Sequence, residues 1–119
     1  MTTIELRRKV AELLGYTDIS VSRMSEGLPK TIINLHGIKG GKYRKKVPEY
    51  ENSLDAIYEV FRENRLDYAL VTIFEPDCPT GYSLSSDSES GKEFEGQTPS
   101  IALCRLFIYL KDPEALTDG

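Results

Sequence analysis

The stretch TPSIALCRLFIYLK, residues 98–111, carries the strongest structural signal in the chain. Thr98 is a preferred helix N-cap residue, and Pro99 fits the first helical position. The dipeptide Asp112-Pro113 then predicts the end of the helix. Apolar side chains leave this helix almost no polar face: Ile101, Ala102, Leu103, Cys104, Leu106, Phe107, Ile108 and Leu110. A helix that is apolar all round is covered on more than one side, so we expect other elements to surround it.

Two sources of that cover stay open. A sheet with a long neighbouring element over the helix would bury it within one chain. Alternatively, a second copy of the chain would supply part of the cover, which predicts a homo-oligomer. The side chains that would form such an interface are Leu103, Leu106, Phe107 and Leu110.

Two more helices are predicted earlier in the chain. Residues 3–14 carry one apolar stripe at three- and four-residue steps: Leu6, Val10, Leu13 and Leu14. Gly15 follows the stripe, at the position where a left-handed C-cap is needed. Residues 53–65 carry a second stripe of the same kind: Leu54, Ile57, Tyr58 and Phe61.

Strands are predicted between the helices. Residues 31–35 and 42–47 indicate a hairpin, because the turn signal Gly40-Gly41 separates them. Residues 67–74 form the most β-rich stretch, and they are apolar enough for a central strand.

These elements predict one α+β domain over residues 1–119. We expect an antiparallel or mixed sheet of about four strands, sandwiched by three helices in the order α-β-β-α-β-β-α. The serine-rich residues 83–91 predict a flexible loop, or a hairpin with arms at 81–84 and 92–95. Residues 114–119 predict a frayed tail.

Charge and composition limit the kinds of partner. The net charge of −4 argues against general nucleic-acid binding, which relies on a surplus of Lys and Arg. The sequence has no apolar run of the roughly 18 residues that span a bilayer, and no signal-peptide pattern. Cys78 and Cys104 follow no metal-ligand spacing and are expected to be reduced thiols of a cytosolic protein. We therefore expect neither a metal nor a cofactor.

A basic segment, residues 30–46, is the first candidate binding site. It holds six cations and no acid: Lys30, Lys39, Lys42, Arg44, Lys45 and Lys46. Its glycine-rich turn exposes backbone N–H groups that, with these cations, could hold a phosphate-bearing ligand. Tyr43 could stack on a base, and so could Tyr82 from another part of the chain. The alternative is a solvated hairpin whose lysines protect an edge strand. The glycines match neither a P-loop nor a dinucleotide fingerprint.

Arg105 is the second candidate, because it is the one charge within the apolar run of residues 98–111. It either extends to solvent or meets an anion or a partner's carboxylate. The acidic loop over residues 75–95 lacks the twelve-residue pattern of a calcium site, which favours a solvated loop.

Catalytic chemistry has the least support. His36 is the only histidine, and its chain neighbours include no acid or nucleophile. A pair of His36 with Cys78 or Cys104 would have to form in space. Cys104 lies in the apolar helix, where a buried thiol is more often inert than activated. We expect no enzyme, and a small hydrolase built on His36 is the least favoured alternative.

Three stretches resemble the phage ABA-sandwich domain, a family of small phage and prophage proteins. Residues 10–16, VAELLGY, are similar to the end of that family's first helix, with Tyr16 in place of a tryptophan. Residues 47–56, VPEYENSLDA, resemble the segment that leads into its middle helix. Residues 97–105, QTPSIALCR, resemble the start of its last helix. The resemblance implies a sandwich fold and a phage or prophage origin, and it implies no catalytic residues.

These observations favour a non-enzymatic accessory protein that acts by binding in the cytoplasm of the host cell. Such a protein would counter host defence, either by sequestering a nucleotide signal or by occluding a host defence protein. For sequestration, the expected ligand-binding residues are Lys39, Lys42, Tyr43, Arg44, Lys45, Lys46, Tyr82 and Arg105. The alternative is a structural or host-protein-binding module with an oligomeric interface on the last helix.

Overall fold

The computed structural model describes residues 1–25, 31–75, 78–87 and 89–116. In chain order the elements are α1 (Thr3–Leu13), β1 (Thr17–Ser25), β2 (Thr31–Ile38), β3 (Arg44–Lys46), α2 (Leu54–Glu63), β4 (Ala69–Glu75), β5 (Cys78–Ser86), β6 (Glu93–Gly96), α3 (Pro99–Lys111) and the 3-10 helix η1 (Pro113–Leu116). No helix within these residues is long and apolar enough to cross a membrane.

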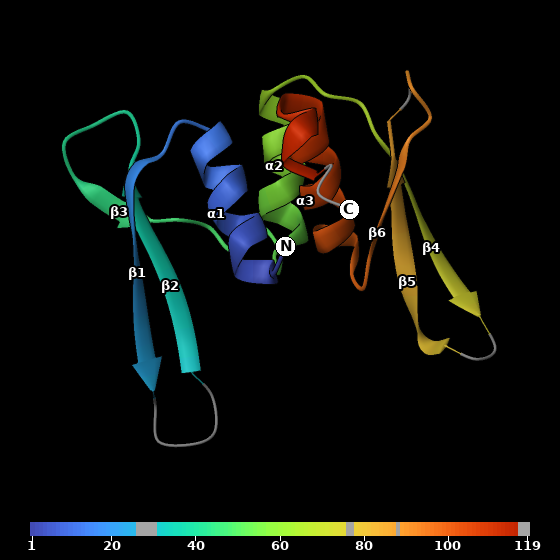
Figure 1. The fold of residues 1–119 in the computed structure, drawn as a ribbon, viewed down its shortest axis with the longest axis horizontal. Coiled ribbons are helices and arrows are strands. Elements are labelled where there is room, and N and C mark those ends of the chain that lie inside the picture. Colours follow the sequence, from blue (N-terminus) through green and yellow to red (C-terminus); the bar gives the residue numbers. More distant parts are fainter. Residues whose placement is uncertain (26–30, 76–77, 88, 117–119) are drawn as a thin grey trace.

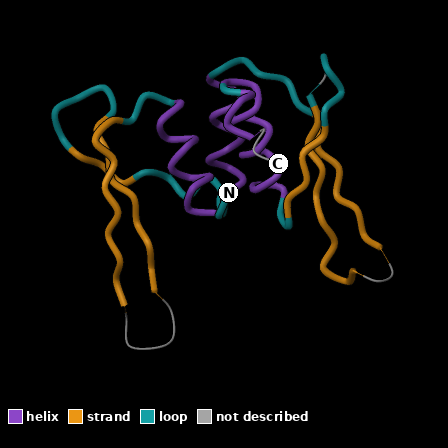
Figure 2. Tube along the Cα trace, in the orientation of Figure 1, coloured by secondary structure: helices purple, strands orange, loops and turns teal. Residues whose placement is uncertain are grey.

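The elements form three layers, with the helices between two antiparallel sheets (Figures 1 and 2). One sheet has the strand order β1-β2-β3, and the other has the order β4-β5-β6. The predicted α+β class and the three helices are confirmed. The described strands form two three-stranded sheets, so the prediction of one sheet of about four strands with helices outside it was wrong.

The layer order follows from α3. Its side chains from Ser100 to Cys104 and from Leu106 to Ile108 are buried, which a helix in an outer layer could not achieve. Helices α1 and α2 and the sheet β4-β5-β6 contact it from different sides. Leu103, Leu106 and Phe107 are wholly buried in the chain's own core, and Leu110 packs against that core. The chain therefore supplies this cover by itself.

Short-range hydrogen bonds define the ends of the helices. The side-chain oxygens of Thr2, Ser53 and Thr98 each accept a hydrogen bond from a first-turn N–H, which caps α1, α2 and α3. Gly15 has a φ of +99°, the left-handed conformation that its place after α1 predicts.

Both predicted hairpins form. Strand β2 pairs with β3 around the Gly40-Gly41 turn, and His36 lies opposite Lys46. Strand β5 pairs with β6, and Leu84 lies opposite Glu95. Residues 83–86 thus belong to a strand, as in the hairpin alternative, and not to a flexible loop. The Asp87 carboxylate accepts hydrogen bonds from the backbone N–H groups of Glu89 and Ser90.

The end of the chain also differs from expectation. Residues 113–116 form η1, although the sequence predicted a frayed tail from residue 114. Residues 117–119 of that predicted tail lie outside the described residues.

Strand β6 approaches α3 very closely at Gly96. A Cβ atom at this position would lie 2.5 Å from the backbone nitrogen of Ala102. Only a residue without a side chain fits here, so Gly96 sets how the last strand passes into the central helix.

Candidate functional site

A cavity of about 310 Å³ lies where α1 and α3 begin. It is lined by Met1, Thr2, Thr3, Leu6, Glu95, Gly96, Gln97, Ile101 and Arg105. Leu6 and Ile101 are buried core residues, so part of the wall is apolar, while the remaining lining is mainly polar. This combination of an apolar wall with a few polar groups is typical of small-molecule sites.

Arg105 supplies the positive charge of this cavity. Its Nη1 donates a hydrogen bond to the carbonyl oxygen of Glu95, which orients the guanidinium along the end of β6. The other guanidinium N–H groups have no hydrogen-bond partner among the described residues. Arg105 is half-buried, so a ligand in the cavity would meet a cation with free donors.

The surrounding backbone adds to this positive character. Both α1 and α3 start at the cavity, and a helix start carries a partial positive charge. Glu95 follows Phe94, which packs against the core, so the exposed Glu95 carboxyl group lies on the face of β6 that points away from the helices. The cavity therefore favours a ligand whose anionic group lies near Arg105.

A second cavity, of about 350 Å³, lies on α2 and is lined by Asp55, Tyr58, Glu59 and Arg62. Its cation is already engaged, since Arg62 donates a hydrogen bond to the carboxylate of Glu59. Two acids share this lining with one arginine, so it is a poorer anion site than the cavity at Arg105.

The basic segment lies apart from both cavities, at the β2–β3 turn of the sheet β1-β2-β3 (Figure 1). Arg44 pairs with the Asp18 carboxylate and also donates to the Asp18 carbonyl oxygen at 2.6 Å. The Nζ atom of Lys39 lies 5.5 Å from the ring centroid of Tyr16. Two of the six cations are thus engaged with neighbouring groups of the same chain.

The remaining described cations of the segment lie on open surface. Lys42, Lys45 and Lys46 are exposed, and Tyr43 is 87% exposed. All three residues of β3 are exposed on an edge strand, an arrangement that protects a sheet edge against pairing.

The predicted ligand-binding residues are therefore not one site. Lys39 to Lys46 lie around β3, whereas Arg105 lies on α3 beside β6, at the far sheet (Figure 1). Lys30 is outside the described residues, as is the side chain of Tyr82.

The candidate catalytic groups are placed separately from the cavity. His36 lies half-buried on β2, between Ser20 of β1 and Lys46 of β3 in the register. Cys104 is wholly buried on α3, and burial raises the pKa of its thiol above the ordinary value. The side chain of Cys78 lies beyond what the structure describes.

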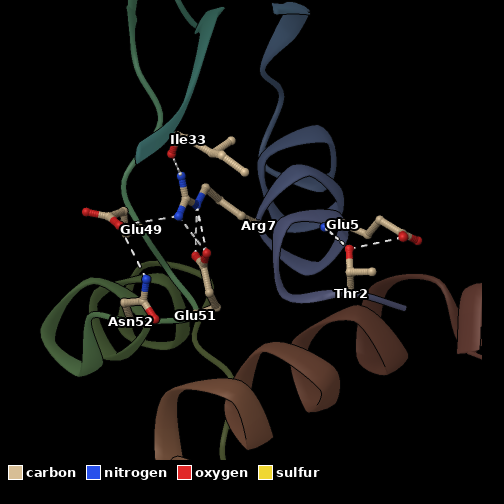
Figure 3. A network of polar contacts seen from close by, with 7 residues as sticks. All are labelled: Thr2, Glu5, Arg7, Ile33, Glu49, Glu51 and Asn52. Atoms are coloured by element: carbon tan, nitrogen blue, oxygen red, sulfur yellow. Dashed lines mark hydrogen bonds and ion pairs between the residues drawn. The ribbon is translucent and has the colours of Figure 1, made fainter. Parts of the chain in front are cut away.

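A buried ion pair joins α1 to the segment that precedes α2 (Figure 3). The Nε of Arg7 lies 2.9 Å from each carboxylate oxygen of Glu51, and the Nη2 lies 2.6 Å from Oε2. Nη1 donates to the carbonyl oxygen of Ile33 on β2 at 2.9 Å, and Nη2 reaches Glu49 at 3.3 Å. Among the described residues, every buried side-chain nitrogen and oxygen has a hydrogen-bond partner.

Sequence reasoning missed this pair. Arg7 lies three and four residues before Val10 and Ala11, so it shares their buried face of α1. A charge at such a position signals a buried partner, although 44 residues separate it from Glu51. The pair fixes α1 against β2 and against the segment before α2, and it supports the fold rather than a ligand.

A solved structure is similar to this chain in its fold. No family model matches the sequence, and no curated protein matches it. The fold is similar to the crystal structure of a phage protein from Bacillus cereus, with a TM-score of 0.53 and 18% sequence identity. The match covers 88% of this chain and 87% of that chain. Over most of both lengths, the chain shares its fold with this phage protein.

Proposed function

We propose that this chain is a phage or prophage accessory protein that acts by binding, without catalysis, and that the cavity at Arg105 holds an anionic small molecule. The origin is supported by the fold shared with a phage protein and by the resemblance of residues 10–16, 47–56 and 97–105 to phage sequences. The observation that carries the binding function is a cavity with a half-buried arginine whose donors are largely unused.

The shape and chemistry of the cavity favour a ligand with two unlike parts. Arg105 and the two helix starts suit a phosphate or carboxylate group, because charge-assisted hydrogen bonds are about twice as strong as neutral ones. Leu6 and Ile101 suit an apolar or aromatic part. The volume of about 310 Å³ lies at the lower end of small-molecule sites. A nucleotide-type molecule combines these two parts.

Binding alone would be enough for the anti-defence role. A protein that sequesters a nucleotide signal lowers its free concentration without breaking any bond, so only affinity and abundance matter. This role needs no nucleophile or general base near the ligand, in keeping with the separation of His36 and Cys104 from the cavity lining.

The proposal is tested by thermal denaturation and calorimetric titration with cyclic and linear nucleotides and with inorganic phosphate. A true ligand at 100 times its dissociation constant stabilises the fold by about 2.7 kcal/mol. Arg105→Gln should abolish this stabilisation. Lys111→Gln removes an exposed cation from the same helix, outside the cavity lining, and should leave it intact. A complete lack of stabilisation by every anion tested, or equal binding by the Arg105→Gln variant, would contradict the proposal.

A second candidate function is the occlusion of a host defence protein through the basic segment. The observation that favours it is the open surface of Lys42, Tyr43, Lys45 and Lys46, since exposed aromatic and cationic side chains suit an acidic protein surface. A combined Lys45→Glu and Lys46→Glu variant should then lose one defined partner from host lysate, while Arg105→Gln keeps it. The opposite pattern would refute this candidate.

A further inference from the structure

Strand β4 (Ala69–Glu75) is an unusually apolar strand for the edge of a sheet. It pairs with β5 on one side only, and it lies farthest from the helices in its sheet (Figure 1). Residues 69–73 read ALVTI, without a charge or a proline. The sequence predicted a central strand here, because this stretch is apolar enough to be covered on both sides. Within the described residues, no strand pairs with the other side of β4.

The other three sheet edges carry recognisable protection. Strand β3 consists of Arg44, Lys45 and Lys46. Strand β1 is mainly polar, and the ion pair of Asp18 with Arg44 holds its start against β3. Strand β6 packs on α3, and Arg105 donates to one of its carbonyl groups. Proteins place charges or covering elements at edges to prevent pairing with other chains, and β4 has neither over residues 69–73.

The face of this sheet that points away from the helices carries apolar side chains on β4 and β5. Ser85 faces the helices, because its Oγ donates to the carbonyl oxygen of Ala102 at 2.6 Å. Leu70 lies opposite Ser85 in the register and packs against the core, so it faces the same way. Val71 lies opposite Leu84, and both face away from the helices because neighbouring residues of a strand alternate.

The side chains on the outward face of β4 are therefore apolar. Val71 is 56% exposed, and Ala69 and Ile73 share its face by alternation. The inward face carries serines at positions 83 and 85, which are buried against the helices. A sheet with branched aliphatic residues exposed on its outward face is incompletely covered as a monomer.

We propose that β4 pairs with β4 of a second copy, antiparallel and about a twofold axis near Val71, to form one six-stranded sheet across a homodimer. The pairing uses the same strand from both chains, so the assembly closes at two. A register centred on Val71 or Thr72 keeps the outward side chains of both copies on one face. This inference is independent of the ligand at Arg105.

The charges on β6 favour pairing at the edge over stacking of the two sheets. Glu95 lies opposite Leu84 and Glu93 lies opposite Ser86, so both acids face outward. Face-to-face stacking would bring these acids onto the apolar strands or toward each other. Edge pairing places the two acidic strands at opposite ends of the six-stranded sheet, far from the axis.

The test is the mass in solution by light scattering and sedimentation at tens of micromolar protein. We expect twice 13.4 kDa for the unaltered chain. Val71→Lys, at an exposed site, should give a folded monomer, because two lysines would face each other near the axis. Val21→Lys is the matched control on the edge strand β1, where Val21 is 44% exposed, and it should remain a dimer.

Each result decides the proposal. If Val71→Lys does not fold by circular dichroism, Ala69→Lys replaces it, since Ala69 is exposed on the same face. A monomeric unaltered chain would overturn the proposal, whether or not β4 pairs with another protein. If the Val71→Lys variant, or its replacement Ala69→Lys, is folded and still a dimer, the interface lies elsewhere and the proposal is equally overturned. Loss of the dimer with Val21→Lys would show a non-specific effect of charge and count against it.

Discussion

Glu51→Gln should destabilise the fold far more than the removal of an ordinary surface charge. Arg7 is 2% exposed and Glu51 is 1% exposed, and their contacts join α1 to the segment before α2 (Figure 3). The substitution keeps the size and shape of the side chain but removes its negative charge. Arg7 would then remain buried, with the half-exposed Glu49 at 3.3 Å as its charged partner among the described residues.

The size of the effect follows from this burial. Removal of one member of a buried ion pair costs about 3–5 kcal/mol, because the other charge stays desolvated. A domain of this kind is stable by about 5–15 kcal/mol, so the loss is a large part of the total. For a chain of this length, roughly 4 °C per kcal/mol predicts a fall in Tm of roughly 12–20 °C.

Urea denaturation followed by circular dichroism measures the difference. Glu12→Gln is the matched control, because it removes an acid from the exposed Arg8–Glu12 pair and should cost less than about 1 kcal/mol. A combined Arg7→Met and Glu51→Leu variant should be more stable than Glu51→Gln alone, since no charge is left buried. A loss for Glu51→Gln no larger than for Glu12→Gln would refute the reasoning.

Three further predictions concern single sites. Gly96→Ala should lower the free energy of unfolding by about 1–3 kcal/mol in urea titrations, because the new Cβ would meet the Ala102 backbone. Gly41→Ala places its Cβ in open space and should change this free energy little. Equal effects of the two substitutions would contradict the close approach of β6 to α3 at Gly96. In a Cys78→Ser variant, the thiol of Cys104 should react with a disulfide reagent at least about two orders of magnitude more slowly in the folded protein than in urea. The reason is that burial raises the pKa of this thiol and blocks access to it. Similar rates in both conditions would contradict this burial. Burial, with a smaller contribution from Tyr16, raises the pKa of Tyr50. The stability that its neutral form contributes is therefore fully present below about pH 10 and is lost as the pH rises above that value. The fall in unfolding free energy at alkaline pH should be smaller for Tyr50→Phe, and an unchanged fall would contradict this contribution of Tyr50.

The helix boundaries and the hairpins were predictable because their signals are local. Thr98 with Pro99 begins α3, and Ser53 caps α2, as the sequence indicates. The Gly40-Gly41 turn joins β2 to β3. Each of these features depends on residues within a few positions along the chain, where propensity and capping decide the conformation.

The layer order was not predictable in the same way, because it depends on contacts that are distant in sequence. The apolar character of residues 69–73 indicated a central strand, but it does not specify whether the neighbouring strand comes from the same chain. Helix α3 is apolar on all sides, so either the same chain or a second copy could have buried it. In the structure, other elements of the same chain bury it. Arg7 and Glu51 find each other across 44 residues, which no local pattern encodes.

The candidate site was foreseen in part. Arg105 was singled out as the one charge in an apolar helix, and it lines the cavity between the starts of α1 and α3. The basic segment was expected to share the ligand with Arg105, but β3 and α3 lie in different parts of the fold. A sequence shows which residues carry charge, whereas their convergence depends on the three-dimensional arrangement of the layers.

We propose that the molecule holds an anionic ligand at Arg105 without changing it chemically. Native mass spectrometry of the protein after incubation with bacterial extract, followed by release and identification of the bound molecule, tests this most directly. We predict one anionic small molecule on the unaltered chain, recovered intact and absent from the Arg105→Gln variant. A bound molecule that is converted to a product, or that the variant retains equally well, would contradict the account.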